Sequence, residues 1–302
     1  MGKKRIIPKS VLPGDTIGIV APASPFDKNK FYKGLNVIES LGFKIFLPEG
    51  LFKKHGYLAG SDSHRASVFN NLFADKTVDA IFCARGGFGS LKILPLIDYE
   101  TVRRNPKIFV GFSDISAVLS VIYNECGLIV FHGPVVTTLE DADERSIGSV
   151  MSAVSSGDVI EMIFKDGFEI KSGIASGKVV GGNLTTLCHL VGTPFEPDFN
   201  GNILFIEERG EAPYRIDRML TQMKMAGCFD GLAGLIICFF ESCGSYRKIC
   251  KIVEEIFSDK DIPVIGGAEA GHGKTNLTIP IGIEAVLDTS RLALNFIEPA
   301  TR

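Results

Sequence analysis

Ser113 lies in a short turn where a nucleophile could act. The apolar run 107–110 predicts the end of a buried strand, and 115–123 carries apolar residues at the spacing of one helical face. A serine between them projects from the carboxyl edge of a sheet, beside the free N–H groups of the helix N-terminus. That geometry suits a nucleophile whose attack creates an oxyanion. On this stretch alone a helix cap is favoured, because Ser and Asp are preferred capping residues. The turn also departs from the G-x-S-x-G elbow, since Ile115 stands at the second glycine.

A serine nucleophile needs a base, and the base needs an orienting group. His272 is the best base by context, because it follows an apolar run and lies among small residues that let a substrate approach closely. A loop histidine without a role is the alternative. We expect His132 to be a core or supporting residue, His189 to be packed inside an apolar helix, and His55 and His64 to lie on the surface.

Two carboxylates could orient the histidine. Glu207 and Glu208 end the apolar run ILFIEE and point to opposite faces of the predicted strand, so at most one should meet the imidazole. The oxyanion donors would be the N–H of Asp114 and an N–H of Gly86 or Gly87 in the turn RGGFGS. That turn could instead cradle a phosphate or simply be tight, but it is not a G-x-G-x-x-G dinucleotide fingerprint.

The elements that must position these residues alternate between strands and helices in the first half of the chain. Such alternation predicts right-handed crossovers and a largely parallel sheet, with ligands outside the carboxyl ends of the strands. The second half adds three further strands, two helices and, near its end, short runs with antiparallel alternation. The predicted strands are 15–21, 44–48, 78–85, 107–110, 128–134, 201–208, 232–240, 263–267, 281–289 and 291–298, and the predicted helices include 27–42, 62–75, 91–97, 115–123, 213–225 and 245–257.

Periodicity weakens after residue 136, which suggests a boundary between two domains. We predict an N-terminal α/β domain at 1–150 that carries the nucleophile. A linker follows at 151–175, and a C-terminal domain at 176–302 carries the glutamate and the histidine.

Composition narrows the class of protein. The 302 residues are 45% apolar and 22% charged, with a net charge of -3, so no electrostatic footprint for nucleic acid or an anionic membrane is expected. No run reaches the ~18–20 apolar residues that span a bilayer, and the N-terminus lacks a signal-peptide core. The seven cysteines lack C-x-x-C spacing, which favours buried, reduced thiols in a cytoplasmic protein over a metal cluster or a catalytic cysteine. We expect no metal and no cofactor.

Six motifs in order carry a resemblance to a known family. They are ARGGFGS, VGFSDIS, FHGP, GGNLTTL, LFIEERGEAPYRIDRML and PVIGGAEAGHG. From about Pro13 to Val286 the sequence resembles the LD-carboxypeptidase family of serine peptidases, which includes muramoyltetrapeptide carboxypeptidases and microcin C immunity peptidases.

The resemblance implies a catalytic triad of Ser113, Glu207 and His272, with oxyanion donors on the turns that hold Gly87 and Asp114. It also implies a flavodoxin-like N-terminal α/β domain, a smaller β-rich C-terminal domain and a homodimer. The predicted activity is the release of terminal D-alanine from murein tetrapeptides, in peptidoglycan recycling.

Two alternatives remain for the function. One is an immunity-type peptidase or amidase acting on peptidyl-nucleotides, which the absence of tryptophan disfavours because no indole can stack on a base. The other is a non-catalytic module that binds a small ligand. A carboxypeptidase must recognise a terminal carboxylate, for which Arg85, beside Gly86, is a candidate, although a structural salt bridge would explain Arg85 equally well.

Overall fold

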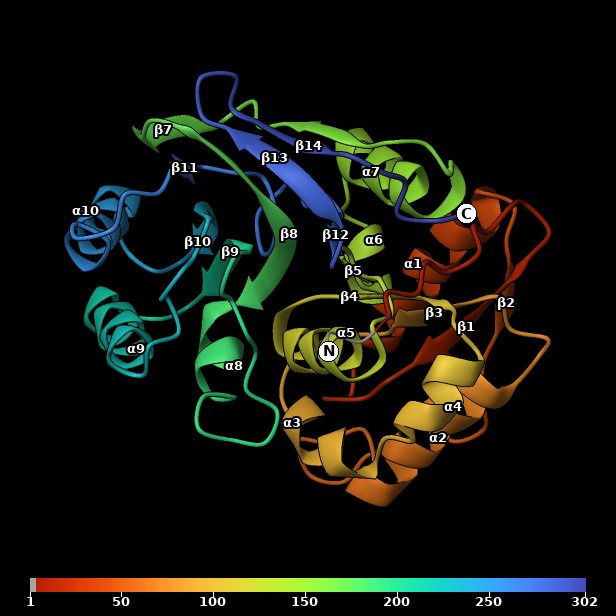
Figure 1. Cartoon of the computed structure of the whole chain (residues 1–302). Coiled ribbons are helices and arrows are strands. Elements are labelled where there is room, and N and C mark those ends of the chain that lie inside the picture. Colours follow the sequence, from red (N-terminus) through yellow and green to blue (C-terminus); the bar gives the residue numbers. More distant parts are fainter. Residues whose placement is uncertain (1–3) are drawn as a thin grey trace.

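The computed structural model describes residues 4–302 and contains two β-sheets (Figure 1). The first sheet has the strand order β12-β5-β4-β3-β1-β2, in which β1 to β5 are parallel and β12 is antiparallel to β5. The order 2-1-3-4-5 of the parallel strands is that of flavodoxin-like folds. The strands are β1 (Thr16–Val20), β2 (Lys44–Phe46), β3 (Ala80–Cys83), β4 (Ile108–Gly111), β5 (Val130–His132) and β12 (Ile279–Ile281).

Helices cover both faces of this sheet. α1 packs on α6, with the backbone of Gly34 close to the carbonyl of Val136, whereas α2, α3, α4 and α5 contact one another on the other face. The helices of this half are α1 (Lys28–Ser40), α2 (Asp62–Ala74), α3 (Ser90–Ile93), α4 (Tyr99–Arg104), α5 (Ser116–Cys126), α6 (Val136–Leu139) and α7 (Glu144–Ser155), with 3-10 turns at η1 (Leu94–Leu96) and η2 (Ser113–Ile115).

The second sheet has eight strands in the order β6-β14-β13-β8-β9-β10-β11-β7, and its consecutive strands β8, β9, β10 and β11 are parallel. One face packs toward the first sheet and the other packs under α9 and α10 (Figure 1). The elements are β6 (Glu161–Ile163), β7 (Phe168–Lys171), β8 (Ile174–Asn183), β9 (Ile203–Arg209), β10 (Gly234–Glu241), β11 (Val264–Gly266), β13 (Glu284–Asp288), β14 (Ala293–Phe296), α8 (Leu184–Cys188), α9 (Pro213–Met225) and α10 (Tyr246–Ile256).

Strand β9 shows why the two halves meet. Ile203 and Phe205 belong to the core shared with the first sheet, whereas Leu204 and Ile206 belong to the core beneath the outer helices. This alternation is the period of two that a strand buried on both faces must have. Glu207 continues the face of Phe205, so its carboxylate points toward the first half of the chain.

The predicted fold class, a parallel α/β domain followed by a smaller β-rich part, is confirmed in these two sheets. The segment 151–175 contains the end of α7 and the strands β6 and β7, both paired within the second sheet. Strand β12, from the last part of the chain, completes the edge of the first sheet. The domain boundaries at 150 and 176 stay a prediction.

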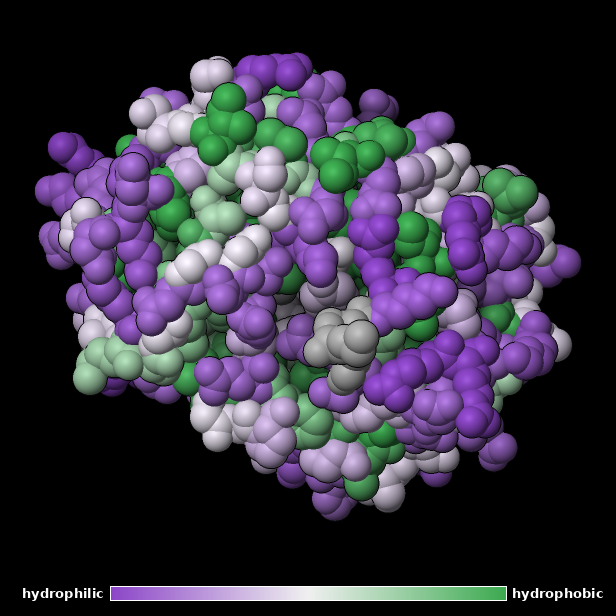
Figure 2. Space-filling model, viewed as in Figure 1, coloured by the Kyte–Doolittle hydropathy of each residue, from purple (hydrophilic) through white to green (hydrophobic). Residues whose placement is uncertain are grey.

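Within the described part of the chain, the cysteines, the helices and the surface can be compared with what the composition predicts. All seven cysteines are buried and unbridged. None of the helices within residues 4–302 is both long and apolar enough to cross a membrane. Figure 2 shows one face on which hydrophilic residues are interspersed with smaller groups of hydrophobic ones.

Candidate active site

Ser113 follows β4 directly and opens the 3-10 turn that leads into α5. Its φ of 65° lies in the left-handed region, which non-glycine residues rarely occupy. Strain of this kind costs of order 1–3 kcal/mol and persists only where the surrounding structure imposes it. The buried strand before the turn and the buried helix after it supply that constraint, since all four residues of β4 are buried. The serine hydroxyl is thereby held beyond the carboxyl end of the sheet.

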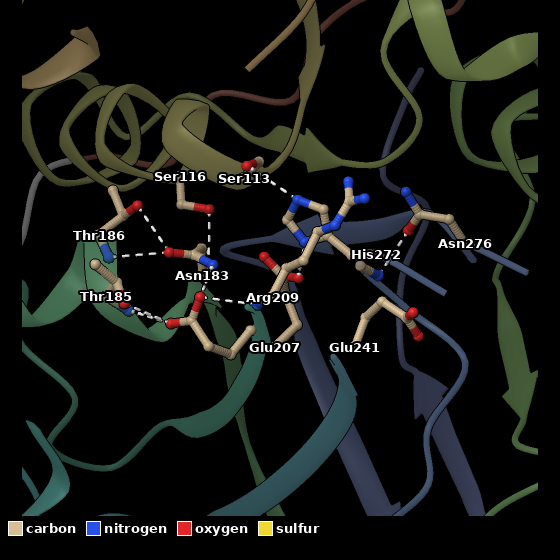
Figure 3. A network of polar contacts seen from close by, with 12 residues as sticks. Ser113, Ser116, Asn183, Thr185, Thr186, Glu207, Arg209, Glu241, His272 and Asn276 are labelled. Atoms are coloured by element: carbon tan, nitrogen blue, oxygen red, sulfur yellow. Dashed lines mark hydrogen bonds and ion pairs between the residues drawn. The ribbon is translucent and has the colours of Figure 1, made fainter. Parts of the chain in front are cut away.

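The structure brings Ser113, His272 and Glu207 into one hydrogen-bonded chain (Figure 3). His272 Nδ1 lies 2.6 Å from Glu207 Oε2, and His272 Nε2 lies 3.1 Å from Ser113 Oγ. An ionised carboxylate can only accept, so Nδ1 donates to Glu207 and Nε2 is left to accept from the serine hydroxyl. Glu207 is fully buried, and 11% of the His272 side chain is exposed. The arrangement can therefore remove the proton of Ser113.

The loop that carries His272 is fixed by several contacts. Gly271 has a φ of 91°, and a Cβ there would lie 2.5 Å from Glu207 Oε2, so only glycine lets the loop approach the carboxylate. The Gly271 N–H donates to Asn276 Oδ1 at 2.8 Å. Upstream, the buried Glu269 accepts from Arg145 Nη1 at 2.6 Å. The imidazole also packs on the ring of Phe112, with the centroids 4.8 Å apart.

The glycine turn lies against the serine turn. A Cβ on Gly86 would lie 3.2 Å from Ser113 Oγ, and Gly87 has a φ of 104°. The two turns are joined by Asp114, whose Oδ2 accepts from the Ser90 N–H at 2.8 Å while its carbonyl accepts from the Ser90 hydroxyl. Burial raises the pKa of the Asp114 carboxyl, and the hydrogen bonds from Ser90 act in the opposite direction.

Arg65 holds the glycine turn from behind. Its side chain is buried, and Nη1 donates to the carbonyls of Gly89, at 2.8 Å, and of Pro22, while Nη2 pairs with Asp62. A buried guanidinium that satisfies two backbone carbonyls fixes their relative positions. The turn after β3 is therefore tied to the turn after β1.

Glu208 does not meet the histidine. Its carboxylate is buried and accepts from Asn183 Nδ2 at 3.0 Å, from the Thr185 N–H at 2.8 Å and from the Thr185 hydroxyl at 2.7 Å. Burial raises its pKa, while these hydrogen bonds lower it. Glu208 thus anchors the start of α8, and the two adjacent glutamates have separate surroundings, as opposite faces of a strand require.

A cavity of about 850 Å³ opens beside the serine. The sequence-predicted Arg85, Gly86, Gly87 and Asp114 line it together with Ser113 and His272. Arg85 is exposed, and its Nη1 donates to the carbonyl of Pro25 at 2.8 Å, rather than to a carboxylate.

Residues that the sequence reasoning did not select also line this cavity. Arg209 is exposed at the end of β9, two positions after Glu207, and its side chain lies beside His272 in Figure 3. The place of Arg209 directly after ILFIEE was the available signal. His189 was expected to be packed, which is wrong: it is the exposed C-cap of the short helix α8 and lines the cavity.

His132 is fully buried at the end of β5 and does not line the cavity, as expected for a core or supporting residue. Burial lowers its pKa to about 4, so the ring is neutral at physiological pH. Within residues 4–302 no group of three or more His, Cys, Asp or Glu side chains is arranged to hold a metal ion.

The sequence also matches models of a known protein family. A family model described as the LD-carboxypeptidase N-terminal domain matches residues 17–133, and one described as the LD-carboxypeptidase C-terminal domain matches residues 176–287. A probable murein peptide carboxypeptidase of Bacillus subtilis (strain 168) is 37% identical, with 94% of this chain and 92% of the relative covered.

One further similarity is to a sequence and another is to a solved structure. A murein tetrapeptide carboxypeptidase of Pseudomonas aeruginosa is 30% identical, with 91% of this chain and 94% of the relative covered. The structure of MccF in complex with glutamyl sulfamoyl guanosine superimposes with a TM-score of 0.91 at 27% identity, covering 98% of this chain and 99% of that one.

Proposed function

The chain belongs to the LD-carboxypeptidase family, and from that premise we propose that it is a serine carboxypeptidase that releases the terminal D-alanine of murein tetrapeptides. The observation that carries the proposal is the chain of hydrogen bonds from Ser113 through His272 to Glu207. A buried glutamate, a histidine and a strained serine at one cavity are the parts that acyl transfer needs.

In the first half of the proposed reaction, His272 Nε2 takes the Ser113 proton as Oγ attacks the carbonyl carbon of the L-configured residue. Glu207 holds the imidazole by Nδ1 and stabilises the imidazolium that forms. The oxyanion is stabilised by the N–H groups of Gly87 and Asp114, each worth ~2.7–4 kcal/mol of barrier. His272 then protonates the leaving amine, and D-alanine departs.

In the second half, a water molecule attacks the ester on Ser113. His272 removes a proton from this water and returns it to Oγ as the ester bond breaks. The remaining tripeptide leaves with a free carboxylate, and the enzyme regains its starting protonation state.

Arg85 and Gly86 are proposed to bind the substrate. Arg85 lines the cavity with its side chain partly in solvent, so its remaining N–H groups are available to a carboxylate. Gly86 lets the substrate backbone pass close to Ser113, because its own Cβ position lies 2.9 Å from the serine Cβ.

The test is a panel of tetrapeptides incubated with the purified chain, with the products identified by mass. L-Ala-D-Glu-meso-diaminopimelate-D-Ala should lose D-alanine, and the same peptide ending in L-alanine should not. A version with L-lysine in the third position shows which diamino acid is accepted. The Ser113→Ala variant is the control, and binding of the tetrapeptide without turnover by the wild type would instead support the non-catalytic module.

A second candidate is an immunity-type peptidase or amidase that acts on a peptidyl-nucleotide. The likeness to MccF, solved with glutamyl sulfamoyl guanosine, favours it. The triad and the mechanism would be the same, so the discriminating measurement is kcat/KM. A kcat/KM higher for glutamyl sulfamoyl guanosine than for the murein tetrapeptide would select this candidate.

We also propose that the chain works in the cytoplasm, on muropeptides and without a cofactor, and that it forms a homodimer. A protein that recycles cell-wall fragments meets its substrate after uptake, which suits the reduced state of the seven buried cysteines. Light scattering after size exclusion should give about twice the 32.7 kDa of one chain, and a mass of one chain would contradict the dimer.

A further inference from the structure

His132 is a buried polar residue to which the proposed mechanism gives no role. It is 0% exposed and is paired in register with Gly111, two residues before Ser113. Among the described residues, neither of its ring nitrogens has a hydrogen-bond partner. Buried polar groups in folded proteins are almost always paired with protein atoms or with ordered water. We therefore expect the two ring nitrogens of His132 to have a hydrogen-bond partner.

The Oε1 atom of Glu207 is likewise buried and has no hydrogen-bond partner among the described residues. Oε2 is engaged by His272, whereas Oε1 is buried without a protein partner. Three of the seven unpartnered buried side-chain atoms in residues 4–302 belong to His132 and Glu207. A carboxylate that stays ionised in such a place needs a donor for its second oxygen.

Ring contacts place His132 and Glu207 in one layer between the two sheets. The His132 ring lies 5.0 Å from the Phe205 ring, and Phe205 precedes Glu207 by two residues on the same face of β9. Phe112 contacts His132 at 5.9 Å and His272 at 4.8 Å between ring centroids. His132 thus lies close to the Glu207–His272 pair, but unlike His272 it does not line the cavity.

We infer that His132 is a positioning residue that donates a hydrogen bond, relayed by buried water, to Oε1 of Glu207. A neutral imidazole has one N–H donor, and water can accept from it and donate to a carboxylate. Burial keeps His132 neutral, so it does not compete as a cation with His272 for the carboxylate. The inference rests on the proposed function, since it concerns the triad of that reaction.

The effect should appear in the pH dependence. Titratable groups that interact with Glu207 are His272 from the following loop, His132 from β5, Cys238 from β10 and the adjacent Glu208, and the charged Arg209 lies beside His272 (Figure 3). A hydrogen-bond donor stabilises the negative charge of a carboxylate, so loss of the donor destabilises the ionised form of Glu207. It also leaves a less satisfied carboxylate beside His272, which favours the imidazolium. Both changes move the acid limb of the kcat/KM profile to higher pH.

The test compares His132→Phe, which fills the site without a polar atom, with His132→Gln, which keeps a donor. His132→Phe should lower kcat about tenfold, the loss typical when an outer group that orients a site residue is removed, with KM unchanged and the acid limb at higher pH. His132→Gln should keep the acid limb of the kcat/KM profile at its wild-type pH. Phe205→Leu is the matched control, because it loosens the packing on His132 without removing a polar group, and should leave the limb in place.

Two results would overturn the inference. One is a wild-type acid limb in His132→Phe, and the other is the same loss of kcat and the same shift of the limb in both variants, which would indicate packing alone. A crystal structure adds a readout that needs no substrate: ordered water should lie within hydrogen-bond distance of His132 and Glu207 Oε1. If the wild type cleaves no tetrapeptide, the proposed function fails, while the crystallographic result still decides on the hydrogen bond.

Discussion

At the scale of single residues, three carboxylates of the site have different hydrogen-bond partners and therefore different roles. Glu207 faces the imidazole, Glu208 holds the start of α8, and Asp114 ties the serine turn to Ser90. All three are buried, so each would be costly without partners. Of the three, Glu207 is the one hydrogen-bonded to a side chain that can gain a positive charge, His272, which makes it the carboxylate that can support a charge formed during reaction.

Replacing the charge of Glu207 tests its role. Glu207→Gln keeps the shape but removes the negative charge that stabilises the imidazolium, so kcat should fall by roughly 10³–10⁴. The thermal midpoint should change little, and circular dichroism should match the wild type. The control is Glu241→Gln, an exposed glutamate at the end of the neighbouring strand β10, which should retain full activity. Unchanged turnover in Glu207→Gln would exclude this role.

The role of the Asp114 side chain can be tested separately from the role of its backbone N–H. Asp114→Ala removes the acceptor of the Ser90 N–H, so the two turns should drift apart and kcat should fall roughly 10–100-fold, less than the loss of a complete oxyanion donor. Asp114→Asn keeps an acceptor oxygen and should retain most of the activity. Steady-state kinetics of the two variants check this, and equal losses would show that the carboxylate charge matters more than the link to Ser90.

At the scale of elements, sequence patterns predicted the parts with strong periodicity. Helix α9 spans 213–225 as predicted, because Pro213 suits the first helical position and its apolar residues recur at helical spacing. Helices α4 and α7 were not predicted. In α7, Ile147, Val150, Met151 and Val154 do recur at the spacing of one helical face, so this helix was predictable, although the glycine and serines between them obscure the pattern. Edge strand β6 buries only Met162, too little for a two-residue pattern.

Lys107 links helix α2 to the strand that leads to Ser113. Its Nζ donates to the carbonyls of Leu72, at 2.8 Å, and of Asp75. Burial lowers the pKa of Lys107 from 10.5 to about 8. Between these two values the unfolded chain holds a proton that the folded chain has released, so the free energy of unfolding rises with pH through this group.

The prediction for Lys107 concerns a difference between two proteins. The free energy of unfolding of the wild type, relative to Lys107→Met, should increase as the pH rises from about 8 to about 10.5. Urea unfolding at several pH values measures it, and subtraction of the variant removes the contributions of the other titrating groups. A difference that is constant over this range would show that the lysine titrates as it does in the unfolded chain.

At the scale of the whole molecule, the site exists only where the two halves meet. Ser113 and the glycine turn come from the first sheet, whereas Glu207 and His272 come from the second sheet and the loop after it. Sequence motifs identified these residues separately, but no local pattern reports a distance between residues 159 positions apart, such as Ser113 and His272. The place of Arg209 after ILFIEE was a signal for a site residue, but for the same reason its position in the cavity relative to His272 could not be predicted.

The junction between the halves can be tested at Gly182, where β8 crosses the start of α5. Gly182 has a φ of 145°, and a Cβ there would lie 2.5 Å from Ser116 Oγ. Gly182→Ala should therefore lower the free energy of unfolding by about 1–3 kcal/mol and reduce kcat, because β9 and Glu207 move with β8. Gly192→Ala is the control for a left-handed glycine in open space. Wild-type kcat with lowered stability would show that the junction does not set the geometry of the triad.

The most direct measurement of the central claim is the covalent state of Ser113 during turnover. Wild-type protein mixed with L-Ala-D-Glu-meso-diaminopimelate-D-Ala and quenched in acid should carry the tripeptide acyl group, and peptide mapping should place it on Ser113. The Ser113→Ala variant should carry none and release no D-alanine. Release of D-alanine by Ser113→Ala at the wild-type rate would contradict the account.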